Sequence, residues 1–440
     1  MPPTTFRSQT TPTTATTPTT ATTATAHPSG TRWPARHFHG VGYVLAILLV
    51  GANMPTALYG IYREDFGFSP VTQTVIFAIY AAALVPALFL FGPLSDRVGR
   101  RPVLATALVA GLAGVAVLVV ADATAWLIVG RVLQGLSVGA CSAAGAAALL
   151  DHVPMGNPVR AARAATASTA AGAALGPLLA GAIAEYLPHP TALPYIFFAV
   201  ALVPGVVALV LLPEQSAPRR RGPSDGTPRR LFEIPRLPRE IRSVFVRATL
   251  PAAIAWATVG LFQSVVPSWI AQLLGMSNLL IGAAAAALVM SCSVAAQLSM
   301  RGLDPLVAQR IGTVLMFAGM VGLFVVDRFP SLPLLIVVSI VVGMGHGLAF
   351  AGGMQRVSAV VATRARESSG AVLAAFFTFT YVGLGVPAVA AGLLVTYQGM
   401  SAAVAEFSVA AAIVSLIALA LNMIRRSDGV ESPGADSARE

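Results

Sequence analysis

The charged and polar side chains that could do chemistry fall in three places of this 440-residue chain. The segment from Gly92 to Leu104 is one, and its charged residues are Asp96, Arg97, Arg100 and Arg101. Carboxylates and guanidinium groups at this spacing can form a cluster of ion pairs. Arg131 and His346 each stand inside an apolar segment, where a charge needs a partner or water and an imidazole can titrate near neutral pH. An imidazole that titrates there could couple proton movement to another process.

Other motifs argue against an enzyme. Gly135-Leu-Ser137-Val-Gly139 fits the hydrolase pattern Gly-x-Ser-x-Gly, but it stands inside an apolar segment and not at a strand-to-helix turn. The chain has no Lys, so the Lys-containing phosphate loop of ATP-driven pumps is excluded. The two Cys lie in separate apolar segments, which excludes a disulfide framework and a Cys-based metal site. We expect no catalytic residue, no cofactor and no metal.

The elements that must position these residues are membrane-spanning helices. Hydrophobic residues make up 56% of the chain and charged residues only 10%, too few for a soluble domain. Twelve apolar segments of about 20 residues, the length of a transmembrane helix, alternate with short polar stretches. Within them only Arg131 and Glu406 are charged. The predicted spans are 39–60, 71–92, 103–121, 126–149, 164–184, 192–213, 248–271, 278–299, 311–326, 333–355, 371–395 and 402–424.

The arginines set the expected orientation. All 28 basic residues are Arg, and a cytoplasmic N-terminus places 25 of them on the cytoplasmic side, with Arg63 and Arg328 outside and Arg131 in the membrane. We therefore expect a multi-pass protein of the plasma (inner) membrane with both termini in the cytoplasm. The net charge of +10 follows from this topology and does not call for a nucleic-acid partner.

The domain plan is a pair of six-helix bundles. Residues 1–37, rich in Thr, Pro and Ala, are predicted to be a disordered cytoplasmic tail followed by an uncleaved first helix. The bundles are 38–213 and 248–424, joined by a basic cytoplasmic linker at 214–247 and followed by a cytoplasmic tail at 425–440. The linker either binds anionic lipid headgroups or only connects the bundles.

An internal repeat of about 210 residues supports this division. Pro55 matches Pro267, and Arg-Val-Gly at 97–99 matches Arg-Ile-Gly at 310–312. Gln-Gly-Leu at 134–136 likewise matches His-Gly-Leu at 346–348. Two parallel halves of this kind occur in transporters that rock one half against the other around a central site.

The loop Gly92-Pro-Leu-Ser-Asp-Arg-Val-Gly-Arg-Arg-Pro-Val-Leu104 resembles the signature loop of the major facilitator superfamily at every defining position. The resemblance implies a twelve-helix secondary transporter in which a charge cluster here latches the two halves in the outward-facing state. The gating residues are then Gly92, Asp96, Arg97, Gly99, Arg100 and Arg101, with Asp151 as the partner of an Arg. Gly92 and Gly99 suit close backbone approach and a tight turn, and Asp96 suits a helix N-cap. The other interpretation of Arg100 and Arg101 is charge that only sets topology.

Two further segments are similar to motifs of the same family. Arg131-Val-Leu-Gln134-Gly135 resembles one in which an intramembrane Arg is linked to proton movement, although an Arg so near a helix end can also extend to the interface. The second resembles the antiporter motif, which the family associates with export, and has Ala180 where one Gly is expected. Close helix packing alone would also explain its small residues. Its residues here are Gly172, Gly176, Pro177 and Gly181.

His346 is the second candidate for proton coupling, unless a neighbouring carbonyl satisfies its ring. Uncharged polar and aromatic side chains from several spans suit a cavity for amphipathic organic solutes. These cavity candidates are Asn53, Tyr80, Gln134, Trp256, Gln263, Gln297, Phe377 and Tyr381. The first span has no acidic residue, whereas some proton-driven multidrug exporters of the family have one there.

The sequence therefore favours a secondary active transporter that exports small amphipathic organic molecules by alternating access, with protons exchanged for substrate. The alternative within the same fold is a sugar or metabolite permease that works as a uniporter or symporter. A membrane enzyme or receptor is the remote alternative. Expected partners are a small-molecule substrate, protons and the lipid bilayer, and the expected state is a monomer.

Overall fold

The computed structural model describes residues 35–154, 157–213, 239–276, 278–300, 302–364 and 369–424. The predicted tail up to residue 34, the predicted linker up to residue 238 and the predicted C-terminal tail lie outside these residues.

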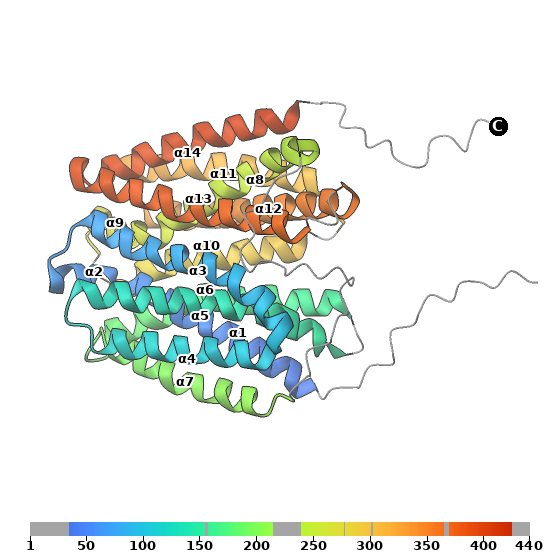
Figure 1. Ribbon diagram of the computed structural model, residues 1–440. Coiled ribbons are helices and arrows are strands. Elements are labelled where there is room, and N and C mark those ends of the chain that lie inside the picture. Colours follow the sequence, from blue (N-terminus) through green and yellow to red (C-terminus); the bar gives the residue numbers. More distant parts are fainter. Residues whose placement is uncertain are drawn as a thin grey trace, which may run out of the picture. The chain divides into compact units, whose positions relative to one another are not determined.

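The described residues are almost entirely α-helical (Figure 1). Twelve of the described segments are long and apolar enough to cross a membrane, in agreement with the twelve predicted spans. The helices before residue 214 are α1 (Ala35–Asn53), α2 (Pro55–Phe66), α3 (Pro70–Val98), α4 (Arg100–Val119), α5 (Thr124–Asp151), α6 (Pro158–Tyr186) and α7 (Leu193–Val210). A 3-10 turn, η2 (Arg239–Ile241), precedes α8 (Arg242–Ser264), α9 (Val266–Leu274), α10 (Leu279–Ser299), α11 (Pro305–Arg328), α12 (Leu332–Arg364), α13 (Ser369–Gln398) and α14 (Met400–Met423).

Several helices extend beyond the predicted spans. α1 begins at Ala35 and α8 at Arg242, so the last part of the predicted linker 214–247 is helical, and α12 continues to Arg364. Hydropathy detects only the apolar part of a helix, whereas the backbone hydrogen bonds continue into the charged turns at its end.

The first and seventh spans are broken, although the sequence predicted continuous helices over 39–60 and 248–271. α1 ends at Asn53 and α2 begins at Pro55, while α8 ends at Ser264 and α9 begins at Val266 with Pro267 in its first turn. Proline has no N–H to give the carbonyl four residues earlier, so each proline interrupts the helix ladder. The two prolines are the pair that the repeat aligns.

The repeat also holds at the next turn of each half. α2 ends at Gly67 and α9 at Gly275, both left-handed, with φ of 65° and 62°. Only glycine adopts this conformation without steric cost. The helix that follows is capped by a side chain in both halves, by Ser69 for α3 and by Asn278 for α10.

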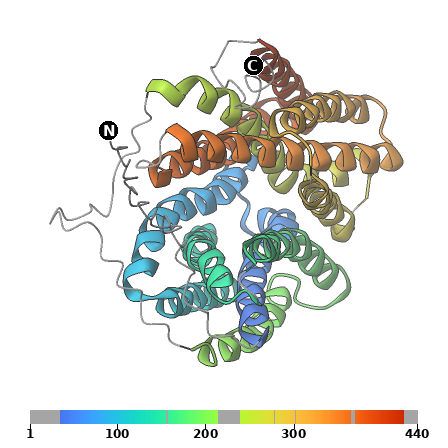
Figure 2. The ribbon, with the colours of Figure 1, turned by 90° about the vertical axis from the view of Figure 1, so that its right-hand side faces the viewer.

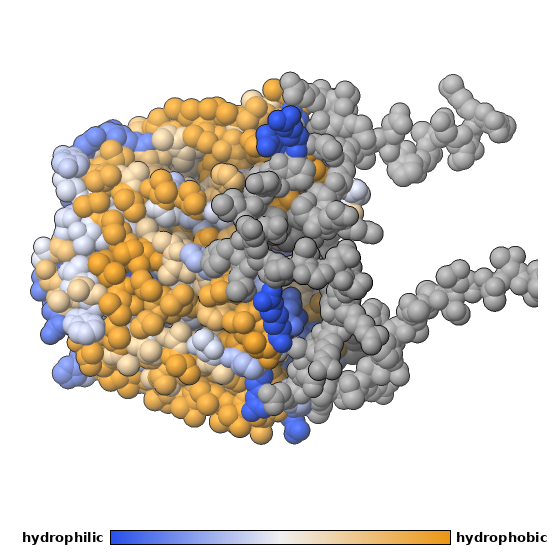
Figure 3. Space-filling view, in the orientation of Figure 1, coloured by the Kyte–Doolittle hydropathy of each residue, from blue (hydrophilic) through white to orange (hydrophobic). Residues whose placement is uncertain are grey.

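The helices form two groups, α1 to α7 and α8 to α14, which Figure 2 shows side by side. The described residues belong to one compact unit, and the groups meet where α3 packs against α13 and α6 against α10. The face of the bundle that Figure 3 shows is largely apolar. Large apolar side chains such as Val109, Val200 and Phe379 are exposed, as expected for a surface in contact with lipid.

Charged residues gather at the ends of the bundle. We call the end where α3 meets α4 the Arg-rich end, since Arg97, Arg100, Arg101, Arg310 and Arg356 lie near it. The opposite, Arg-poor end includes the ends of α2, α6 and α11, with Arg63 and Arg328.

Gly312 offers a test of the close packing of α11 against α12. A Cβ there would lie 2.3 Å from the backbone nitrogen of Ala349 in α12, whereas a Cβ at Gly60 in α2 would meet nothing within 4 Å. We expect Gly312→Ala to lower the free energy of unfolding by about 1–3 kcal/mol. Gly60→Ala is the matched control and should leave it unchanged or raise it by up to about 1 kcal/mol. Thermal unfolding of the detergent-purified variants measures both, and equal stability of the two would contradict the packing described.

Candidate functional site

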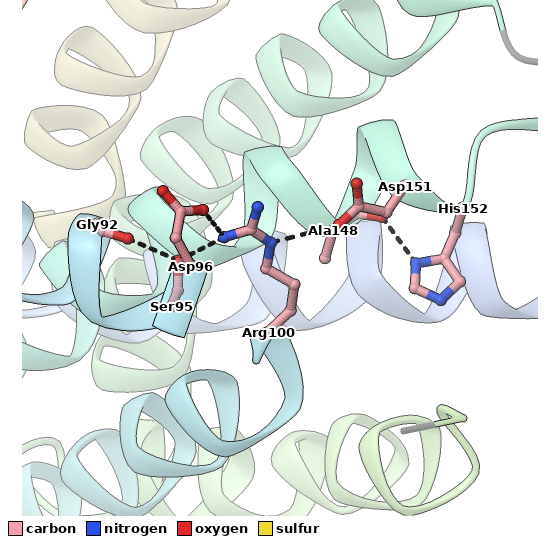
Figure 4. A network of polar contacts seen from close by, with 7 residues as sticks. All are labelled: Gly92, Ser95, Asp96, Arg100, Ala148, Asp151 and His152. Carbon is pink, nitrogen blue, oxygen red and sulfur yellow. Dashed lines mark hydrogen bonds and ion pairs between the residues drawn. The ribbon is translucent and has the colours of Figure 1, made fainter. Parts of the chain in front are cut away.

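The charge cluster at the Arg-rich end joins three helices of the first half (Figure 4). Arg100, the first residue of α4, places Nη1 2.5 Å from Asp96 Oδ1 in the last turn of α3. Its Nε lies 3.3 Å from Asp151 Oδ2 at the end of α5, and its Nη1 donates to Ser95 Oγ at 2.8 Å. Gly99, with a φ of 100°, makes the turn between α3 and α4 that allows this contact.

Other residues of the signature loop have different surroundings. Arg101 donates to the carbonyl of Val210 at 3.1 Å and so fastens α4 to the end of α7, while Arg97 is exposed. A Cβ at Gly92 would meet no atom within 4 Å, so close backbone approach does not explain this glycine. Asp96 pairs with Arg100 at a helix C-terminus and is not the predicted N-cap, because α3 continues to Val98.

Arg131 is buried in α5 and is held by the end of α1. Its Nη1 donates to the carbonyl of Ala52 at 2.6 Å and to Gln134 Oε1 at 2.9 Å. Gln134 in turn donates to the carbonyl of Gly51 at 3.0 Å. The guanidinium carbon lies 4.4 Å from the centre of the Tyr80 ring, a cation–π distance. The guanidinium therefore points into the protein and not to the interface.

His346 stands in an aromatic cluster of the second half. Its Nδ1 lies 2.7 Å from Ser293 Oγ in α10, which also accepts a hydrogen bond from Gln297 at 3.1 Å. The His346 ring is edge-on to that of Trp256, with 5.3 Å between the ring centroids, and stacked on that of Phe350, with 6.1 Å between the centroids. A hydroxyl, and not a neighbouring carbonyl, thus holds the ring, and its Nε2 is buried without a hydrogen-bond partner.

The two clusters are joined across the two groups of helices. The ring centroid of Tyr381 in α13 lies 5.4 Å from that of Trp256. Tyr80, whose ring lies beneath Arg131, belongs to α3, and α3 packs against α13. A groove of about 580 Å³ between α3 and α13 also reaches Tyr381, the one polar side chain among the twelve that line it. We call the series from Arg131 through Tyr80, Tyr381 and Trp256 to His346 the Arg131–His346 row.

The other predicted cavity residues lie nearby or apart. Phe377 contacts Phe376 and through it Phe350 at the edge of the aromatic cluster. Asn53 is buried and donates to the carbonyl of Leu49 at 2.7 Å, beside the α1–α2 break. Gln263 is buried farther along α8, toward the Arg-poor end.

The small residues of α6 allow close packing. A Cβ at Gly172 would lie 2.2 Å from Leu49 Cβ, and one at Gly176 2.5 Å from the carbonyl oxygen of Val50, both in α1. Gly181 faces Ala283 of α10 in the other half, and Pro177 lies inside α6. α6 therefore contacts the broken helix of its own half as well as the opposite half.

Hydrogen bonds between the halves lie at the Arg-poor end. Gln73 of α3 donates to the carbonyl of Ser264 at 2.6 Å, and the backbone N–H of Val71 donates to Thr396 of α13 at 3.2 Å. On the other side of the bundle, Glu185 of α6 accepts from the N–H of Leu279 at 2.9 Å. These contacts join the two halves at the Arg-poor end, and we call them the seal.

Comparison with known proteins decides the family. The model of the Major Facilitator Superfamily matches residues 40–386. The chain belongs to this superfamily. A match of this extent, with relatives that are transport proteins, identifies a transporter and not an enzyme. The twelve described spans accordingly make it a multi-pass membrane protein.

The superfamily member is similar to several curated bacterial proteins. It is 33% identical over 207 residues to the multidrug efflux pump LfrA of Mycolicibacterium smegmatis, which is 45% of this chain and 39% of LfrA. It is 33% identical over 175 residues to the class B tetracycline resistance protein of Escherichia coli, and the match covers 39% of this chain and 40% of that protein. It is 34% identical over 95 residues to the inner membrane transport protein YnfM of Escherichia coli K12, and the match covers 21% of this chain and 22% of YnfM. The matched parts thus span between about a fifth and two fifths of these relatives.

Solved structures share the fold. A bacterial homologue of the human lysosomal transporter Spinster, inward-facing and occupied, matches with a TM-score of 0.65 and 14% identity, over 90% of this chain and 97% of that one. The nucleoside transporter NupG matches with a TM-score of 0.68 and 12% identity, over 89% of this chain and 99% of NupG.

Sequence reasoning missed a polar network at the Arg-rich end of the second half. Arg356 of α12 donates to Gln309 Oε1 and, at 2.7 Å, to Asn422 Oδ1 of α14. Gln309 also donates to the carbonyl of Ala248 at 2.7 Å, and Asn422 to that of Arg247 at 3.0 Å. The signal was present, because the repeat that aligns 97–99 with 310–312 places Gln309 opposite Asp96.

Ser293 provides a test of the aromatic cluster in this superfamily member. Its removal leaves both ring nitrogens of His346 buried without partners, so Ser293→Ala should lower the free energy of unfolding by about 1–3 kcal/mol. Ser291→Ala on the exposed side of the same helix should change it by less than about 0.5 kcal/mol. Thermal unfolding compares the two, and an equal effect would show that the Ser293–His346 contact does not contribute.

Proposed function

We propose that the chain is a secondary exporter of small amphipathic organic molecules that exchanges substrate for protons by alternating access. The observation that carries the proposal is a difference between the two ends of the bundle. The seal joins the two halves at the Arg-poor end, whereas the Asp96–Arg100–Asp151 cluster at the Arg-rich end joins helices of the first half alone. A protein that opens its two ends in turn joins its halves at one end while the other end is free to open.

The orientation proposed from the arginines relates the seal to the transport cycle. With the Arg-rich end in the cytoplasm of a bacterial cell, both chain ends lie there too and the seal lies outside. The structure then corresponds to the state that is closed to the outside. A fluorescent protein fused to the C-terminus should fluoresce, whereas alkaline phosphatase fused there should be inactive. Active phosphatase would refute this orientation.

Export, as opposed to uptake, is supported by the named relatives and by α6. LfrA is an efflux pump by name, and the contacts of Gly172 and Gly176 with α1 fit the antiporter-type motif. Gly172, Gly176, Pro177 and Gly181 are proposed to shape α6, while Gly92, Asp96, Arg97, Gly99, Arg100, Arg101 and Asp151 are proposed to control opening of the Arg-rich end.

Proton coupling is proposed for His346 and Arg131. Nε2 of His346 is buried without a partner and can take up a proton, and the Arg131–His346 row leads from it to the first half where α13 packs against α3. Arg131 keeps its charge, so its role is to act on neighbouring groups through its electric field. The substrate is proposed to bind between the halves, along the row and beside Asn53, Gln134, Gln263, Gln297 and Phe377.

Everted membrane vesicles test this function. An inside-acid pH gradient should drive the accumulation of amphipathic dyes in vesicles that contain the protein, and nigericin should abolish it. Asp96→Asn should slow accumulation by about tenfold or more. The exposed ion pair contributes at most about 1 kcal/mol, so stability should change little. Glu406→Gln, a carboxylate-to-amide change on the exposed face of α14, is the matched control and should accumulate dye at the wild-type rate. Accumulation that ignores the pH gradient would favour the permease alternative and refute proton exchange.

A further inference from the structure

Arg131 is a positive charge that the described part of the protein leaves without an opposite charge. Its side chain is 3% exposed, and its hydrogen-bond acceptors are the carbonyl of Ala52 and the amide of Gln134, both neutral. Its Nε has no hydrogen-bond partner. Arg100 at the Arg-rich end, by contrast, has two carboxylate partners, Asp96 and Asp151.

No described carboxylate is placed to supply the missing charge. Those on the described helices lie at helix ends, such as Glu185 and Asp327, or on an exposed face, as does Glu406. Dipoles of carbonyl and amide groups compensate a buried charge only in part, and an unpaired charge in an apolar interior is unfavourable. The interior around Arg131 therefore has a positive potential that an anion would neutralise.

The fold itself does not require this charge. His346 follows Gln134 by 212 positions, and the same offset from Arg131 leads to Gly343. In the second half, that glycine packs closely against Val289 and Cys292 of α10. The same helix arrangement thus forms in one half with a buried guanidinium and in the other with no side chain at all, which argues that the charge serves a ligand.

The neighbours of Arg131 indicate the rest of that ligand. The Arg131–His346 row includes the ring of Tyr80 beneath Arg131 and the adjacent rings of Tyr381 and Trp256 on helices that pack against one another. Trp256 Nε1 is buried without an acceptor, as His346 Nε2 is without a partner. Aromatic rings favour a flat apolar body, and a free indole N–H favours an acceptor atom on it.

We propose that the substrate is an organic anion, a carboxylate or a comparable monoanion on an aromatic body, and that its charge binds Arg131. The proposal rests on the proposed transport function and adds the class of solute. The membrane potential of a bacterial cell, negative inside, would then favour export of this charge.

Three probes with one ring system test the charge preference. These are 2-naphthoate, 2-naphthamide and 2-naphthyltrimethylammonium, and their binding to the full-length purified protein is measured by calorimetry and by thermal shift. We expect 2-naphthoate to bind at least about tenfold more tightly than either of the others. Arg131→Gln should remove the preference and Arg131→Lys should retain most of it. Arg328→Gln, which removes an Arg that also stacks on a ring, Phe324, at the Arg-poor end, should retain all of it.

A second variant keeps the test decisive if Arg131→Gln does not fold. Gln134→Glu keeps the shape of the side chain and places a carboxylate oxygen where Oε1 lies, 2.9 Å from Arg131 Nη1. The protein then supplies its own counter-charge. Binding of 2-naphthoate should fall by at least about tenfold, while that of 2-naphthamide stays within about threefold of the wild type.

Three results would overturn the proposal: equal or tighter binding of the ammonium probe, no binding of any of the three probes to the wild type, or full 2-naphthoate binding by Gln134→Glu. Failure of the proposed function gives a different result. In that case 2-naphthoate binds in an Arg131-dependent way, but everted vesicles do not accumulate solutes when the pH gradient is imposed.

Discussion

A polar group inside this apolar bundle must find its partner within the protein, and the arrangement of the first half follows from that requirement. Arg131 and Gln134 of α5 bond to the carbonyls of Ala52 and Gly51 at the end of α1. Pro55 lies four residues after Gly51 and has no N–H to donate to the Gly51 carbonyl. Pro55 thus leaves the Gly51 carbonyl without a donor from its own helix. Gln134 of α5 donates to this carbonyl, and Arg131 donates to the neighbouring carbonyl of Ala52.

At the Arg-rich end, each half has an arginine held by side chains of neighbouring helices, but the partner groups differ between the halves. In the first half, carboxylates of α3 and α5 hold Arg100. In the second half, the neutral amides of Gln309 and Asn422 hold Arg356. Salt screens the first network more, because it consists of exposed ion pairs, whereas the amide partners of Arg356 in the second, partly buried network carry no net charge. The two halves therefore respond differently to ionic conditions, although the same repeat generates both.

Much of this could be predicted from the sequence, because hydropathy and the placement of arginines are direct physical signals. The twelve spans and the superfamily follow from them and from the loop at 92–104. The helix breaks at Pro55 and Pro267 were missed because the apolar pattern continues across them. The partners of Arg131 and His346 were also missed. Ser293 and the carbonyl of Ala52 become neighbours only through helix packing, and a single sequence does not encode those distances locally.

The two broken spans differ in where their carbonyls find donors. The carbonyls before the α1–α2 break bond to α5 within the same half, whereas Ser264, before the α8–α9 break, accepts from Gln73 of the opposite half. In the proposed transport cycle the halves part at the Arg-poor end, so the first break keeps its donors and Ser264 loses Gln73. Bending during the cycle should therefore concentrate at α8–α9, which gives a protein built from two related halves an unequal pair of hinges.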